Sequence, residues 1–197
     1  MRTALFTMIT VVLTLTSATA FAGDVVDHSG FDELLGEYVN SRGLVAYETW
    51  HENDEDMKAL DAYLERVADA DPGEHSQKAQ LAFYINAYNA HVIDELLDRW
   101  PVKNPLKVDG FFKKIKHQVA GESMTLDELE HGLIRKEFSE PRIHFVLNCA
   151  ARSCPKLRQS AVTESNLEST LAKATTEFVP AATKLEDGKV VTSQLFN

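Results

Sequence analysis

The sequence predicts an α+β domain that is predominantly helical, with a small sheet of short strands and one central buried helix over about residues 76–100. Three observations lead to this prediction. Apolar residues recur at spacings of three and four along several segments, which is the period of an amphipathic helix. The segment 76–100 contains no Pro or Gly and is apolar on nearly every face, as expected for a helix inside a domain. Short stretches rich in β-branched residues, bounded by turn residues, indicate the strands.

Residues 1–22 have the pattern of a cleavable signal peptide. Arg2 is the only charged residue of this segment, the run from Ala4 to Thr16 is largely apolar, and Ala20-Phe21-Ala22 provides small residues at a cleavage site. The apolar run is shorter than the roughly 20 residues that span a bilayer, so we expect no stable membrane anchor after cleavage. The sequence therefore predicts a periplasmic or secreted protein.

The charge of the chain argues against one class of partner. The 197 residues include 20 Lys and Arg against 30 Asp and Glu, which gives a net charge of −10. Nucleic acids and anionic membranes bind clustered Lys and Arg, and the single basic run, residues 113–117, is too short to form such a surface. We therefore expect no nucleic acid as partner, and a small molecule or a peptide as the candidate ligand.

The N-terminal part, residues 23–75, is predicted to be a helical lead-in packed on the core domain. Apolar residues at helical spacing predict one helix over 31–39, before Gly43, and a second over 57–67. Between these helices, β-branched and aromatic residues nearly alternate over 44–50, which favours an extended segment.

The core domain is predicted to cover residues 76–197, and its apolar end, 194–197, leaves open a continuation past Asn197. Thr125 and Glu128 form a capping box that opens a helix, because each side chain can bond the backbone N–H of the other residue. The other predicted elements, in chain order, are the helix 76–100 ended by Pro101, a hairpin arm over 115–119, a buried strand over 142–147, a helix over 167–178 ended by Pro180, and a short strand over 188–191.

Both cysteines lie in the segment 148–155, directly after the predicted buried strand. An exported protein enters an oxidising compartment, so one interpretation is a structural disulfide between Cys149 and Cys154. The other is a catalytic Cys149, which would need nearby cations to hold it as a thiolate. A redox pair ranks last, because the spacing differs from C-x-x-C.

Two further groups of polar residues are candidates for a site. His131 shares a helix face with Asp127 and Arg135 at a spacing of four, which suits a general base with an orienting carboxylate and equally suits a solvated surface cluster. Asn86 and Asn89 lie three apart on the apolar helix, so their amides are expected either to hold a neighbouring loop or to line a pocket. His144 alternates with apolar neighbours on the predicted strand and is expected to be buried and hydrogen-bonded.

Several site motifs are absent from the sequence. It has no H-E-x-x-H, no C-x-x-C, no phosphate-binding glycine loop and no G-x-S-x-G. We therefore expect no metal and no cofactor.

Three segments together carry a resemblance to a known family: 82–90 (AFYINAYNA), 125–132 (TLDELEHG) and 141–155 (PRIHFVLNCAARSCP). With these motifs in order, the chain resembles domain-of-unknown-function family 547 from about Gln77 to Phe178. The resemblance implies a fold and a set of marked positions but no reaction. The marked positions are Asn86, Asn89, Glu130, His131, Arg135, Arg142, His144 and Cys149.

Two functional hypotheses follow. The first is a cysteine-dependent hydrolase or acyl transferase, with Cys149 as nucleophile, His131 as base, Glu130 or Asp127 as its orienting group and Arg142 as a charge stabiliser. The alternative is a non-catalytic binding module with a structural Cys149–Cys154 disulfide. The residues expected to bind its ligand are Asn86, Asn89, Arg135, His144 and Cys154.

Overall fold

In the computed structural model of the chain, the described residues are 22–151, 154–181, 183–186 and 189–192. The predicted signal peptide, residues 1–22, lies outside the described residues except for Ala22, and so does the apolar end, residues 194–197. No helix in the described part of the chain is both long and apolar enough to cross a membrane.

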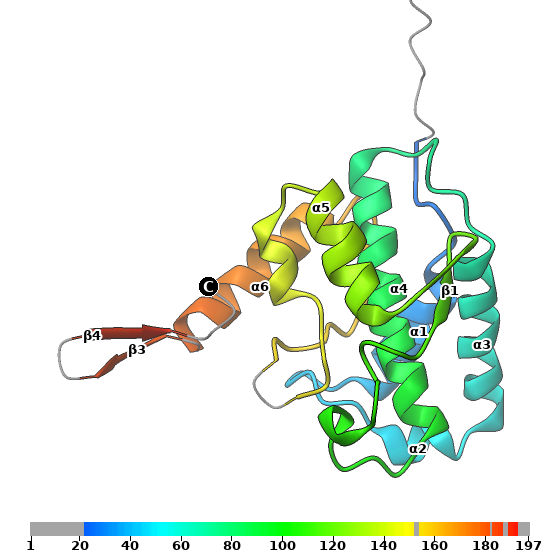
Figure 1. Cartoon of the computed structure of the whole chain (residues 1–197), viewed down its shortest axis with the longest axis horizontal. Helices are drawn as coiled ribbons and strands as arrows, with labels where there is room; N and C mark the ends of the chain where they lie inside the picture. The colour runs from blue at the N-terminus through cyan, green and yellow to red at the C-terminus, as the bar shows by residue number, and fades with distance from the viewer. Residues whose placement is uncertain (1–21, 152–153, 182, 187–188, 193–197) are drawn as a thin grey trace, which may run out of the picture.

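The protein is predominantly helical with short antiparallel strands, which confirms the predicted fold class (Figure 1). The strands form two separate two-stranded sheets, β1–β2 and β3–β4, where the sequence suggested one small sheet. The elements in chain order are α1 (Ser29–Tyr38), α2 (Tyr47–His51), α3 (Asp54–Ala68), α4 (Gln77–Asp98), η1 (Pro105–Lys107), β1 (His117–Val119), β2 (Glu122–Met124), η2 (Glu128–Ile134), α5 (Arg135–Glu137), η3 (Pro141–Phe145), α6 (Leu167–Ala181), β3 (Thr183–Glu186) and β4 (Lys189–Thr192).

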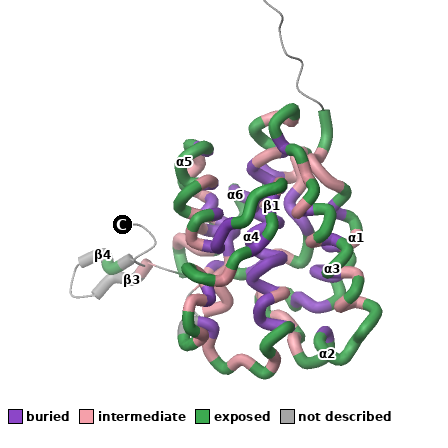
Figure 2. The backbone as a smooth tube through the Cα atoms, turned by 45° about the vertical axis from the view of Figure 1, so that its right-hand side comes forward, coloured by how far each residue is buried: buried purple, intermediate pink, exposed green. Residues whose placement is uncertain are grey.

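Helix α4 is the central element, as the sequence predicted. Ser76 caps it by accepting a hydrogen bond from the backbone N–H of Ala79 at 3.1 Å. Every residue from Leu81 to Ile93 is buried, and Figure 2 shows α4 as a largely purple tube between its neighbours. Because apolar residues cover all its faces, α4 can be surrounded by other elements on every side.

Helices α1, α2 and α3 pack with one another, and α2 and α3 pack on α4. These helices belong to residues 23–75, the predicted lead-in. The hairpin β1–β2 is tied to the end of α3, since the N–H groups of Ala120 and Gly121 donate to the carbonyls of Val67 and Ala68 at 2.9 and 2.7 Å. Ala120 and Gly121 both have positive φ (53° and 76°), as a tight two-residue hairpin turn requires.

The capping box is confirmed. The backbone N–H of Thr125 donates to Glu128 Oε2 at 2.7 Å, and the N–H of Glu128 donates to Thr125 Oγ1 at 3.1 Å. The helix that follows is a π-helix, η2, which continues into the short helix α5.

Three predictions about local structure are wrong. Residues 142–147 were expected to form a buried strand, but Pro141–Phe145 form a 3-10 helix, η3, with Glu140 accepting the N–H of Arg142. Short apolar runs do not separate strand from helix by their period alone. Residues 44–50 are not a strand either: Val45 forms one isolated bridge with Val39, and α2 then begins at Tyr47.

The third error concerns the end of α6. Pro180 was expected to end this helix, but α6 runs to Ala181 and includes Pro180 in its last turn. β4 begins at Lys189, close to the predicted strand over 188–191, whereas Gly188 lies outside the described residues. Its partner β3 was not predicted.

Candidate functional site

The two asparagines of α4 hold two loops that are distant in sequence. Asn86 donates through Nδ2 to the Val162 carbonyl at 2.6 Å and accepts the Val162 N–H on Oδ1 at 2.9 Å. Asn89 donates through Nδ2 to the Val146 carbonyl and accepts the Asn148 N–H, both at 2.9 Å. Both amides lie on one face of α4 and both bond backbone groups, which matches the loop-holding alternative. A ligand-binding role for them stays a prediction.

The segment held by Asn89 leads into the cysteine loop. Cys149 and Cys154 form a disulfide, with their Cα atoms 6.1 Å apart. Asn148 closes the base of the loop, because its side chain donates to the Pro155 carbonyl at 2.7 Å and accepts the Ala150 N–H at 2.8 Å. In this state the Cys149 sulfur is not a thiolate, so it cannot act as a nucleophile.

His131 lies between the two residues that share its helix face. Arg135 Nη1 donates to His131 Nδ1 at 3.0 Å, and Asp127 Oδ1 is 4.0 Å from His131 Nε2. A guanidinium can only donate, so Nδ1 accepts and the neutral imidazole carries its proton on Nε2. The side chain is 47% exposed, and Asp127 also lies 3.5 Å from Lys113 Nζ. This arrangement resembles a solvated surface cluster more than an oriented general base.

Glu130 and His144 form a second polar cluster with Tyr88 of α4. His144 Nδ1 lies 3.9 Å from Glu130 Oε1. His144 is on the 3-10 helix and half-buried, whereas the sequence placed it buried on a strand. Burial lowers the pKa of His144, and Arg135 adds to this effect while Glu130 opposes it. Burial and the Glu130 carboxylate raise the pKa of Tyr88.

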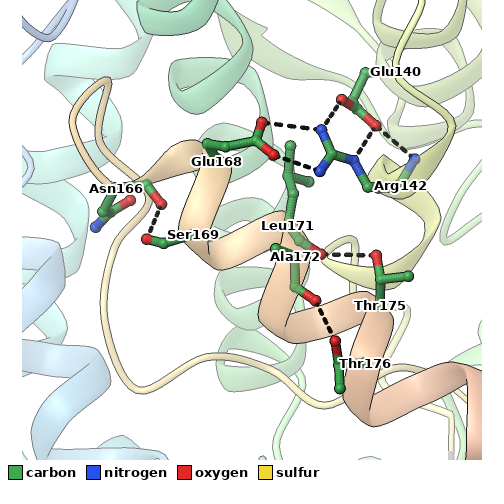
Figure 3. A network of polar contacts seen from close by, with 9 residues as sticks. All are labelled: Glu140, Arg142, Asn166, Glu168, Ser169, Leu171, Ala172, Thr175 and Thr176. Atoms are coloured by element: carbon green, nitrogen blue, oxygen red, sulfur yellow. Dashed lines mark hydrogen bonds and ion pairs between the residues drawn. The ribbon is translucent and has the colours of Figure 1, made fainter.

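Arg142 is bound by two carboxylates from different elements (Figure 3). Its Nε and Nη2 donate to Glu140 at 2.7 and 2.6 Å, and its Nη1 and Nη2 donate to Glu168 of α6 at 2.7 and 3.0 Å. These contacts raise the pKa of Arg142. The same contacts join η3 to α6 and use all the nitrogens of the guanidinium. The sequence had suggested Arg142 as a charge stabiliser in a catalytic site.

A cavity of about 590 Å³ lies beside the cysteine loop. Residues far apart in the sequence line it: the loop after α1, the end of η3, the segment after the disulfide, and one side of α6. Among the residues that line it are Arg42, Leu44, Phe145, Lys156, Arg158 and Phe178. Of the predicted site residues, only Cys154 lines this cavity.

The predicted site residues therefore fall into separate groups rather than one catalytic cluster. Among the described residues, neither His131 nor His144 has a hydrogen bond or an ion pair with Cys149. The residues that line the cavity from the N-terminal loop and from α6 were missed, because nothing in the sequence links positions 42–44 with 174–181. No three His, Cys, Asp or Glu side chains in the described part of the chain form a group that could hold a metal ion.

Comparison with known families gives one result. A family model described as "Protein of unknown function, DUF547" matches residues 72–179, from just before α4 to near the end of α6. No curated protein and no solved structure matches the chain. The matched region contains both asparagines of α4, the Glu130 and His131 helix, Arg142 and the cysteine loop.

Proposed function

The chain belongs to the DUF547 family, and from that premise we propose that it is an exported, non-catalytic binding protein whose ligand occupies the cavity beside the cysteine loop. One observation carries the proposal. The sulfur of Cys149, the only nucleophile suggested by the sequence, is bonded to Cys154, and Cys154 lines a cavity large enough for a small molecule.

The other residues that a thiol enzyme would need also have contacts that favour a non-catalytic protein. Arg142 is bound by Glu140 and Glu168, and the Nδ1 lone pair of His131 accepts from Arg135. A base for thiol chemistry must reach the nucleophile by a hydrogen bond or through one water. Arg142 instead joins η3 to α6, and Arg135 and His131 contact each other on one helix face.

Export is part of the proposal. The pattern of residues 1–22 is that of a signal peptide, and disulfides persist in oxidising compartments. We propose that the mature protein is periplasmic or secreted, without a stable membrane anchor. The net charge of −10 argues against a nucleic acid partner.

The first experiment measures the thiol state in protein recovered from its native compartment. Intact mass after alkylation, with and without prior reduction, is expected to show no alkylation of Cys149 or Cys154 until a reductant is added. Rapid alkylation of Cys149 without reductant, well below pH 8, would instead favour the cysteine-dependent hydrolase or acyl transferase.

The second experiment locates the ligand site. A thermal-shift screen of small molecules and short peptides is run on the wild type and on Ala174→Trp, which places a bulky ring in the cavity wall. Ala181→Trp serves as a second variant, because Ala181 lines the cavity and is exposed, so its substitution should be tolerated. Ala172→Trp is the control on an exposed position of α6 outside the cavity. Shifts lost in the cavity variants but kept in the control support the proposal, and shifts kept in all variants contradict it.

A further inference from the structure

We infer that the cavity beside the cysteine loop takes a small amphipathic anion, with an apolar body against α6 and η3 and a carboxylate-like head at Arg42 and Lys156. This inference rests on the proposed binding function and specifies the chemical class of its ligand.

The cavity lining has a charge opposite to that of the whole protein. The chain has a net charge of −10, yet among the described residues the cavity lining contains three cations, Arg42, Lys156 and Arg158, and one carboxylate, Glu177. Arg158 Nη1 pairs with Glu177 Oε2 at 2.8 Å. Arg42 and Lys156 are exposed, and neither has a carboxylate partner within the described residues. Two cationic groups are therefore left for an anionic ligand.

Close backbone packing brings these two cations to the same place. Gly43 has a φ of +76°, and a Cβ atom at this position would lie 2.7 Å from Lys156 Cβ and 2.8 Å from the Leu157 backbone nitrogen. Only glycine accommodates both this conformation and this approach. Because Arg42 directly precedes Gly43, the contact fixes the backbone of Arg42 beside that of Lys156.

Arg158 is a third cation in the cavity lining, but its guanidinium is largely enclosed. Its side chain is 16% exposed, and its Nε atom is buried with no hydrogen-bond partner in the described part of the protein. The Nε atom is closed to solvent and Nη1 is paired with Glu177, so Arg42 and Lys156 are the cations that can meet a head group in the cavity. An ionised carboxylate can only accept hydrogen bonds, which matches these two donors.

Behind the cations the cavity is apolar. The rings of Phe145 and Phe178 lie 5.2 Å apart, centroid to centroid, and Ala174 is buried beside them in the lining. Leu44 is 54% exposed, and only Val191 joins it as a large exposed hydrophobic side chain among the described residues. A ligand with an aliphatic or aromatic body would cover this leucine and gain apolar burial.

The test compares three ligands that share a ten-carbon chain and differ in their head group: decanoate, decanol and decyltrimethylammonium. Binding is measured by calorimetry below the concentrations at which these compounds form micelles. We expect decanoate to bind most tightly, and its affinity to fall as the salt concentration rises. We expect the cationic compound to bind most weakly.

Variants then assign the head group to its site. Arg42→Gln combined with Lys156→Gln is expected to weaken decanoate binding about tenfold and to leave decanol binding nearly unchanged. Leu44→Ser is expected to weaken the binding of both decanoate and decanol. The control is Lys58→Gln, which removes an exposed cation of α3 outside the cavity and should change neither affinity.

The outcomes separate this inference from the proposed function. If the three compounds bind equally, or if the double variant leaves decanoate binding unchanged, the anion-binding inference is overturned while a binding function at the cavity stands. If no compound of any class binds the wild type in the thermal-shift screen, the proposed function itself fails.

Discussion

At the scale of single residues, the polar side chains of this protein mostly bind its own backbone and its own charges. Asn86 and Asn89 stand out in the sequence because asparagine is unusual inside an apolar helix. In the structure each one bonds an N–H and a carbonyl of a loop. Arg142 is likewise bound by carboxylates of its own chain. The polar residues that stand out in this sequence therefore make contacts that hold the fold together.

Asn86→Ala is expected to reduce the free energy of unfolding by about 2–4 kcal/mol, because the N–H and the carbonyl of Val162 both lose their partner in a buried place. Urea denaturation measures this change. Asn86→Asp is the matched variant: it keeps the acceptor for the N–H but turns an oxygen toward the Val162 carbonyl, so it should also be destabilising at pH 7. A change below about 0.5 kcal/mol in Asn86→Ala would contradict the loop-holding role.

Arg142→Lys is expected to cost about 1 kcal/mol, because an ammonium cannot form the two-pronged contacts with Glu140 and Glu168. Part of this loss of stability comes from the ion pair with the exposed Glu168, and this part should shrink at high salt. Denaturation at low and high salt checks both points. An unchanged stability at low salt would show that this contact does not help to hold η3 on α6.

At the scale of elements, the packing of β1 on the central helix creates a buried pair of histidines. His91 of α4 and His117 of β1 have ring centroids 4.5 Å apart and are almost fully buried. Burial lowers the pKa of His91 to about 3, with His117 adding to the effect and the nearby backbone of Gln118 opposing it. Burial and Arg99 lower the pKa of His117 to about 4.

Two carboxylates of α4, Glu95 and Asp94, have pKa values that shift in the opposite direction. Glu95 Oε1 is 4.0 Å from His117 Nδ1, Glu95 also pairs with Arg99, and burial raises the pKa of Glu95. Burial, followed by the nearby Asp98, raises the pKa of Asp94 to about 7. These histidines and carboxylates therefore make opposite contributions to the stability of the protein in acid.

The sign of each contribution follows from proton linkage. In the unfolded state a histidine takes up its proton near pH 6.5, but His91 stays neutral in the folded state until far lower pH. Its protonation therefore favours unfolding increasingly as the pH falls from 6.5 toward 4. Asp94 binds a proton more tightly in the folded state, so its contribution is full below about pH 4 and is lost as the pH rises through 7.

His91→Leu is expected to lessen the loss of stability between pH 6.5 and 4 by on the order of 2 kcal/mol. Asp94→Asn should increase the loss of stability between pH 6.5 and 4, because it removes the contribution that favours the folded state in acid. Thermal melts across this pH range measure both effects. His51→Leu, at an exposed position of α2, is the control, and an equal effect in this control would contradict the role assigned to the buried pair.

At the scale of the whole molecule, the residues just after the predicted cleavage site are bound to the body of the protein. The backbone nitrogen of Gly23 donates to Glu164 Oε2 at 2.9 Å, and Ser76 at the start of α4 donates to Glu164 Oε1 at 2.5 Å. In return, Asp24 accepts the N–H of Glu164 at 2.6 Å. Both donors lower the pKa of Glu164.

Cleavage after Ala22 would turn the Gly23 nitrogen into a charged ammonium facing this carboxylate. We expect the mature protein that begins at Gly23 to have a higher Tm than the same chain with an acetylated N-terminus, because acetylation removes the charge. Glu164→Gln should abolish the difference. Since the pKa of Glu164 is lowered, the difference should be present at neutral pH and disappear as the pH falls through that pKa.

N-terminal sequencing of protein from the periplasm or medium tests the premise, since it is expected to give Gly23 as the first residue. A chain that retains Met1 there would contradict cleavage after Ala22 and the expected ion pair, whereas absence of the protein from both fractions would contradict export.

The sequence by itself determined the elements whose signals are local. The helix α4 follows from a long apolar run between Ser76 and Pro101, and the capping box from two residues three apart. The family also follows from the sequence, because its motifs lie in order along one stretch. The sequence also limited the main possible roles of the two cysteines to a structural disulfide or a catalytic nucleophile. The expected compartment favoured the disulfide, and the spacing ranked a redox pair last.

Only the tertiary structure decided what those residues do together. Pro141–Phe145 form a 3-10 helix rather than a strand, because contacts with α6 and the cap from Glu140 outweigh the strand preference of a short apolar run. The cavity joins Arg42, Phe145, Lys156 and Phe178. These positions are more than 130 residues apart at the extremes, and no periodicity or capping rule connects them. Local signals set the elements, whereas packing between distant segments brings side chains into one site, and that packing depends on the whole chain.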